Sequence, residues 1–115
     1  MLNHIETDDI FGATITCSEY HWYNHVASGS HAIMLNNKMA VVDTLSSPEI
    51  VYKANEHDDR LVFFKKSTYS TYNSERFYTK VIVGYTSQIT GEIVTAFPVE
   101  GIRGGIGDVI YPQSN

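Results

Sequence analysis

The chain of 115 residues is poor in cysteine and proline and has no long apolar run. Its single cysteine excludes an internal disulfide framework and any zinc site built from several thiolates. The apolar runs are too short to span a bilayer, so we expect no membrane segment. The first nine residues are rich in acidic side chains and lack the apolar core of a signal peptide, so we expect a cytoplasmic protein.

Basic side chains are also scarce: the sequence has eight Lys and Arg residues and thirteen Asp and Glu residues, which gives a formal net charge of −5. Nucleic-acid-binding domains usually run basic, so this sum argues against a general nucleic-acid binder. The distribution is less uniform, since residues 60–80 hold five of the eight cations and only one acidic side chain. Such a segment is either an ordinary solvated strand face or a cationic site for an anion.

Length and composition predict one globular domain over residues 1–115, with 43% apolar and 18% charged residues. No internal repeat or low-complexity tract divides it. Helical spacing of apolar residues dominates the first half, and a short strand is expected before it, over residues 10–16. The chain turns strand-like near its middle.

Three helices are expected. A capping box, with Thr16 as N-cap and Glu19 three residues later, predicts the first helix over residues 16–27. Ser46 followed by Pro48 in the first turn is typical of a helix start and predicts the third. Between them, a second helix is expected to face the core through apolar side chains at helical spacing, namely Leu35, Met39 and Val42.

From Arg60 onward, short runs of branched and aromatic residues predict antiparallel strands over residues 60–66, 77–85 and 92–97. Helices followed by an antiparallel meander are an α+β pattern. We expect the helices to pack on a sheet of roughly four strands. The glycine-rich residues 99–115 are expected to form a flexible tail over the sheet edge.

His21 and His25 are the first candidates for chemistry. Their i, i+4 spacing would present both imidazoles on one helix face, as in zinc-binding helices. The glutamate of such helices and a third ligand are missing, so we expect no metal site. Two alternatives stay open, a half-buried structural imidazole and a general acid or base.

Other catalytic patterns are absent. Residues 101–107 lack the lysine of a phosphate-binding loop, and the sequence has no Gly-x-Ser-x-Gly elbow. Cys17 lies at an expected helix start with no evident base beside it, which disfavours a nucleophilic role. Tyr78 lies within the cationic segment, where its ring could stack on a base.

Several short motifs nevertheless occur in a characteristic order: His25 to His31, Leu45 to Tyr52, Arg60 with Phe63-Phe64-Lys65, Val81 to Val83, and Gly91 to Phe97. Together they resemble the phage-associated nuclease-like family grouped with barnase, EndoU, the tRNA-cutting colicins and RelE. The resemblance covers about residues 16–98. It implies helices packed on a four-stranded antiparallel sheet and a metal-independent ribonuclease without cofactor, often a toxin or phage effector, with an antitoxin or immunity protein as partner.

The resemblance also implies site residues. It places histidines at His25 and His31, basic residues at Arg60 and Lys65, and a threonine at Thr95. Family members commonly have a proline and an acidic residue after the second histidine, whereas alanine and isoleucine follow here.

RNA cleavage without metal uses the ribose 2′-hydroxyl as nucleophile and needs a base, an acid and cations for the phosphate. His25 suits the base or acid, and Thr95 could donate a hydrogen bond to a phosphate oxygen. Arg60, Lys65 or Lys80 could hold the phosphate. Tyr78 and Lys80 share a strand face and are expected to contact the substrate. The alternative, favoured by the negative net charge, is a non-catalytic interaction domain with a degenerate nuclease fold.

Overall fold

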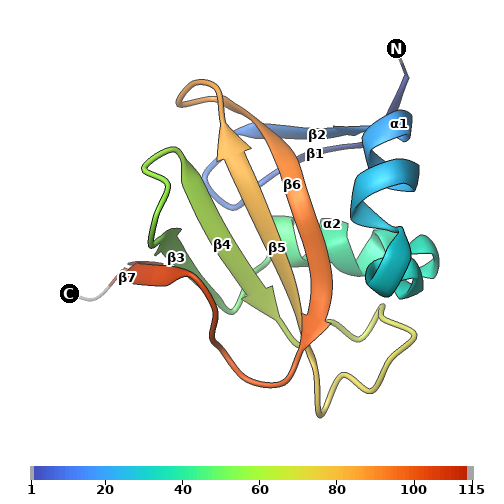
Figure 1. Cartoon of the computed structure of the whole chain (residues 1–115). Helices are drawn as coiled ribbons and strands as arrows, with labels where there is room; N and C mark the ends of the chain where they lie inside the picture. Colours follow the sequence, from blue (N-terminus) through green and yellow to red (C-terminus); the bar gives the residue numbers. More distant parts are fainter. Residues whose placement is uncertain (1, 114–115) are drawn as a thin grey trace.

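The computed structural model describes residues 2–113; Met1 and the last two residues of the expected tail, Ser114 and Asn115, lie outside that range. Seven strands form one sheet in the order β1-β2-β6-β5-β4-β3-β7, and four short helical segments follow β2 in the chain (Figure 1). In chain order the elements are β1 Asn3–Asp8, β2 Thr14–Ser18, α1 Glu19–His21, the π-helical η1 Trp22–Val26, the 3₁₀-helical η2 Gly29–Asn36, α2 Lys38–Ser46, β3 Ile50–Ala54, β4 Arg60–Lys65, β5 Tyr78–Tyr85, β6 Thr90–Val99 and β7 Ile106–Tyr111.

The predicted α+β class is confirmed, but the predicted sheet is wrong in its extent and pairing. The β1–β2 hairpin precedes the helices, and β2 pairs parallel with β6, whereas the other neighbouring strands are antiparallel. The sheet includes residues on both sides of 16–98. β1 comes before this range, and β7, which lies in the segment expected to be a flexible tail, pairs with β3. Both β1 and β7 are edge strands, and their polar or glycine-containing sequences carry little strand signal. No helix within residues 2–113 is long and apolar enough to cross a membrane.

The predicted helix boundaries also need correction. Thr16 lies in β2, and the N-cap is Ser18, whose hydroxyl accepts a hydrogen bond from the His21 amide at 3.0 Å. The third expected helix is the strand β3, because the residue before Pro48 is disfavoured in helical conformation and branched residues follow it. The Glu49 carboxylate anchors this segment by accepting a hydrogen bond from the Lys66 amide at 2.6 Å.

The inward face of the second expected helix differs as well. Leu35 and Met39 are exposed, at 46% and 54%, whereas Met34 and Val41 are fully buried. The cause is a change of helix type at the buried Asn37, where η2 ends and α2 begins. The 3₁₀ winding of η2 breaks the α-helical spacing on which the prediction depended.

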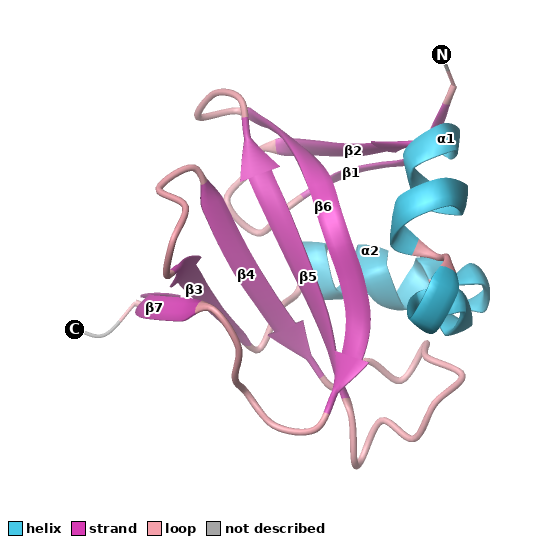
Figure 2. Ribbon diagram, viewed as in Figure 1, coloured by secondary structure: helices cyan, strands magenta, loops and turns pink. Residues whose placement is uncertain are grey.

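The core lies between α2 and one face of the sheet (Figure 2). Val41 and Leu45 of α2 pack in one cluster with Phe63, Val81 and Ile93 of β4, β5 and β6. The residues that alternate with these along the strands point to the opposite face. This outer face of β4, β5 and β6 has no α-helix over it in Figure 1, and α1 and η1 lie beside β6.

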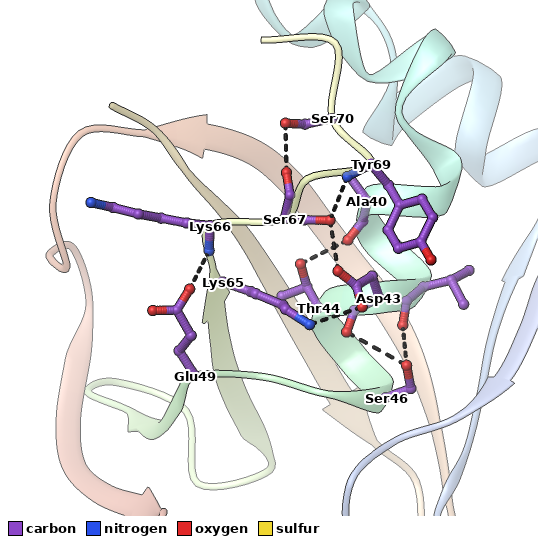
Figure 3. A network of polar contacts seen from close by, with 11 residues as sticks. Ala40, Asp43, Thr44, Ser46, Glu49, Lys65, Lys66, Ser67, Tyr69 and Ser70 are labelled. Atoms are coloured by element: carbon purple, nitrogen blue, oxygen red, sulfur yellow. Dashed lines mark hydrogen bonds and ion pairs between the residues drawn. The ribbon is translucent and has the colours of Figure 1, made fainter. Parts of the chain in front are cut away.

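A polar network ties α2 to the end of β4 (Figure 3). The Asp43 carboxylate accepts hydrogen bonds from the Lys65 ammonium at 2.9 Å and from the Ser67 hydroxyl at 2.8 Å. Both charged side chains are mostly buried, at 22% exposure for Lys65 and 17% for Asp43. The network therefore positions α2 against the sheet at the start of the loop that leads to β5.

We expect Asp43→Ala to lower the free energy of unfolding by about 1–3 kcal/mol, because it leaves two half-buried donors without their acceptor. Chemical denaturation measures the change. Asp108→Ala is the matched control: Asp108 is exposed on the edge strand β7. Its removal should change stability by less than about 0.5 kcal/mol. Equal effects of the two substitutions would contradict the anchoring role of Asp43.

Gly91→Ala should destabilise the fold by about 1–3 kcal/mol through overpacking. A Cβ atom at Gly91 would lie 3.0 Å from Val83 Cγ1, 3.1 Å from Ile15 Cδ1 and 3.1 Å from the Gly84 carbonyl oxygen. Gly107→Ala on β7 meets nothing closer than 3.4 Å and serves as control in the same denaturation experiment. A Gly91→Ala protein as stable as this control would show that the contact relaxes without cost.

Candidate functional site

A row of directly paired residues crosses the outer face of the sheet. Arg60 pairs with Gly84, Gly84 with Glu92, and Glu92 with Thr16. Paired residues share a face, so Arg60 and Glu92 point to the same side, with β5 between them. Two strand spacings separate their backbones by about 10 Å. Gly84 lies between them without a side chain, and a Cβ atom there would lie 3.4 Å from Val94 Cγ2 and 4.0 Å from Arg60 Cγ.

Two adjoining pockets open along this row. Arg60, Glu92 and His21 line a pocket of about 270 Å³. Glu92 and His21 also line the second pocket, of about 430 Å³, together with Thr16 and His25. His21, Glu92 and Ile93 lie in the walls of both, so the two pockets adjoin, and we call them together the Arg60–His25 groove.

His21 is held at the centre of the groove by the open edge of β6. β2 pairs with β6 only as far as Glu92, and a bulge at Val94 follows. The Nε2 atom of His21 lies 3.0 Å from the Val94 carbonyl oxygen. A carbonyl only accepts, so Nε2 must carry the proton and donate. Nδ1 is therefore the ring nitrogen left to exchange protons with a ligand.

The charged and titratable side chains of the groove are not neutralised by one another. Within residues 2–113, neither the Arg60 guanidinium nor the Glu92 carboxylate makes a hydrogen bond or ion pair; the two ion pairs there are Lys65 with Asp43 and Arg76 with Glu100. The ring of His25 is exposed and its centroid lies 5.2 Å from that of His21. An arginine, two carboxylates (Asp59 and Glu92) and two imidazoles thus line the groove.

Lys65 does not belong to this group. It lies five residues from Arg60 on the same strand, so the two side chains point to opposite faces of the sheet. Its ammonium is bound to Asp43 on the side of α2 (Figure 3). The structure thus gives Lys65 a place in the anchoring network, away from the groove.

Lys80 shares the outer face with Arg60 but is nearly buried, at 5% exposure. Its ammonium donates to the carbonyl oxygens of Arg103 and Gly104 at 3.0 and 2.9 Å, and it lies 5.2 Å from the centre of the Phe97 ring. Burial lowers the pKa of Lys80. This lysine therefore holds the chain between β6 and β7 against the sheet. The compact cationic site expected from residues 60–80 is not formed.

The remaining predicted residues come from three elements, η2, β5 and β6, and lie along the outer face away from Arg60. His31 stacks on Phe97, with ring centroids 4.7 Å apart. Thr95 lies between Val94 and Phe97 and pairs with Ile82 of β5, so it shares the face of Arg60. Tyr78 lies at the far end of the same face, where the Lys66 ammonium sits 5.0 Å from its ring centre. His31, Thr95 and Tyr78 do not line the groove.

One groove residue, Glu92, was not singled out by the sequence. His21 was a candidate through its spacing to His25, as a structural imidazole or as a general acid or base; among residues 2–113 no three His, Cys, Asp or Glu side chains are grouped to hold a metal ion. No sequence signal marks Glu92, because its position opposite Arg60 depends on strand register. Cys17 is buried and its pKa is raised to about 12, chiefly by burial, so it remains a thiol at neutral pH.

Comparisons with known proteins add no relative to this geometry. No family model matches the chain, and neither a curated protein nor a solved structure matches it. The resemblance to the nuclease-like family therefore stays a prediction from the sequence, and the function must be argued from the groove itself.

Proposed function

We propose that the chain is a metal-independent endoribonuclease that cleaves RNA in the Arg60–His25 groove. The observation that carries the proposal is the presence of an arginine without an ion pair, two carboxylates (Asp59 and Glu92) and two imidazoles in these adjoining pockets. These are the group types that phosphodiester cleavage by an internal hydroxyl requires: a cation for the phosphate, a proton acceptor and a proton donor. RNA is the proposed substrate, and an antitoxin or immunity protein the proposed partner.

In the proposed reaction the ribose 2′-oxygen attacks the adjacent phosphorus and the bond from phosphorus to the 5′-oxygen breaks. Glu92 takes the 2′-proton, and an imidazolium returns a proton to the departing 5′-oxygen. The products are a 2′,3′-cyclic phosphate and a 5′-hydroxyl end. Arg60 binds the phosphate through its forked N–H groups, which match two phosphate oxygens and stabilise the charge of the transition state.

His21 is the better-placed imidazole for the departing oxygen, because it lines the Arg60 pocket whereas His25 lines the neighbouring one. The hydrogen bond from Nε2 to Val94 fixes its ring and leaves Nδ1 for proton transfer. Thr95 shares the outer face and could donate to a phosphate oxygen from the next position along β6.

One observation favours the second candidate, a non-catalytic interaction domain. Lys65 and Lys80 are both engaged within the fold, so Arg60 stands as the single basic side chain that lines the groove. With a net charge of −5, long-range attraction of RNA is weak. Catalysis is the direct measure that separates the two candidates.

We expect the purified protein to cleave total tRNA or ribosomal RNA with equal rates in the presence and absence of a metal chelator, and to leave 2′,3′-cyclic phosphate ends. Arg60→Ala and Glu92→Gln should each reduce the rate by about 10²–10⁴-fold. Lys65→Met is the control: it should lower stability but leave the rate per folded molecule unchanged. Absence of cleavage by folded protein freed of any bound partner would favour the interaction domain.

The roles of the two histidines are separated by His21→Gln and His25→Gln. Glutamine at residue 21 can still donate a hydrogen bond to Val94 but cannot transfer a proton, so we expect the larger loss in kcat there, about 10²-fold or more. Single-turnover cleavage of a short RNA gives the rates, and circular dichroism confirms the fold. A larger loss for His25→Gln would assign the proton donor to His25 instead.

A further inference from the structure

The two ends of the Arg60–His25 groove differ in chemistry. The pocket at the Arg60 end offers a cation beside two carboxylates, Asp59 and Glu92. The larger pocket of about 430 Å³, which we call the Tyr20 pocket, has no Lys or Arg in its wall, and the Glu92 carboxylate lies at its boundary with the Arg60 end. A phosphate is therefore disfavoured in the Tyr20 pocket, and a neutral part of a ligand suits it better. Its volume falls within the range of about 300–1,000 Å³ typical of small-ligand pockets.

An aromatic ring forms one wall of this pocket. Tyr20 is 62% exposed in the short helix α1. Its ring centroid lies 5.8 Å from that of His25, and the two ring planes are inclined by 59°. Exposed aromatic rings of this kind stack on nucleobases in proteins that bind single-stranded nucleic acid.

Polar groups of both hydrogen-bonding types line the rest of the pocket. The Thr16 hydroxyl makes no hydrogen bond within residues 2–113. The Ser18 oxygen accepts from the His21 amide, which leaves its own proton free to donate. The Asn3 amide nitrogen donates to Glu6 at 3.3 Å, which leaves the Asn3 side-chain oxygen free to accept. Donors and acceptors beside a stacking ring match the edge of an unpaired base.

We propose that the Tyr20 pocket binds an unpaired nucleobase of single-stranded RNA, from the nucleotide next to the cleaved phosphate, and that it sets the base preference of cleavage. This inference rests on the proposed ribonuclease function and extends it from chemistry to recognition. The adjacency of the two pockets supports it, since His21 and Glu92 line both and a base bound in one would lie beside a phosphate bound in the other. Tyr20 supplies stacking, and Asn3, Thr16 and Ser18 read the base edge.

The first test uses uncharged nucleosides, so that it does not depend on catalysis. Adenosine, guanosine, cytidine and uridine are titrated into the protein and followed by amide NMR shifts. We expect saturable shifts at Thr16, Tyr20 and His25, with one nucleoside binding most tightly. Tyr20→Ala should weaken that binding by about tenfold or more, while Tyr20→Phe should retain it, because stacking needs only the ring. Tyr69→Ala is the matched control, since Tyr69 is equally exposed, at 61%, outside the pocket.

The second test measures kcat/KM for dinucleotides that differ in one base on either side of the cleaved phosphate. Wild-type protein should prefer one base at one position, and Tyr20→Ala and Thr16→Val should reduce that preference by about fivefold or more. Cleavage with unchanged preferences in these variants, or nucleoside binding that leaves the pocket amides unshifted, overturns the inference while the proposed function stands. Nucleoside binding that depends on Tyr20 without cleavage of any RNA supports the pocket and contradicts the nuclease.

Discussion

The change in pairing along β6 is the constraint on which the groove depends. β6 has neighbours on both sides for its first three residues and only β5 beyond Glu92. The open edge leaves the Val94 carbonyl without a strand partner, and a buried or half-buried carbonyl needs a donor. His21 supplies it, which fixes the imidazole beside Glu92. The missing strand partner of Val94 thus explains why the His21 ring is held at this position.

The alternation of side chains along the strands is the second constraint. It assigns Arg60 to the outer face and Lys65 to the face that packs on α2. Lys80 also lies on the outer face, but its hydrogen bonds to the carbonyl groups of the segment after β6 keep its ammonium away from the groove. Arg60, Lys65 and Lys80, which lie close together in sequence, are therefore distributed over the groove, a structural anchor and a loop contact, while Arg76 pairs with Glu100 and Lys66 lies beside Tyr78.

Recognition by such a groove would be local. The negative net charge gives no general attraction for RNA. One arginine would bind a single phosphate, and aromatic and hydroxyl groups would bind the adjoining base. This combination favours a short contact of one or two nucleotides over binding along an extended strand.

Local sequence patterns predicted several parts of the fold correctly. The strands β4, β5 and β6 follow from runs of branched and aromatic residues, which favour extended backbone whatever their partners. The helical stretch around Trp22 follows from apolar spacing and a nearby cap. The strand β3 was missed because Ser46 and Pro48 form a helix-start signal. In the fold, the hydrogen bond from the Lys66 amide to the Glu49 carboxylate ties this segment to the end of β4 instead.

The candidate site could be predicted only in part for a related reason. The residue types and the short spacing between His21 and His25 lie in the sequence, as does Arg60 at the start of a strand, because these depend on local chain geometry. The position of Glu92 opposite Arg60 depends on the register of three strands, and the distribution of the lysines depends on which face each one occupies. Strand register, and the face of the sheet on which each side chain lies, are set only when the strands pair and the sheet packs on α2. The sequence by itself therefore determined which chemical groups are present, and the tertiary structure decided which of them meet.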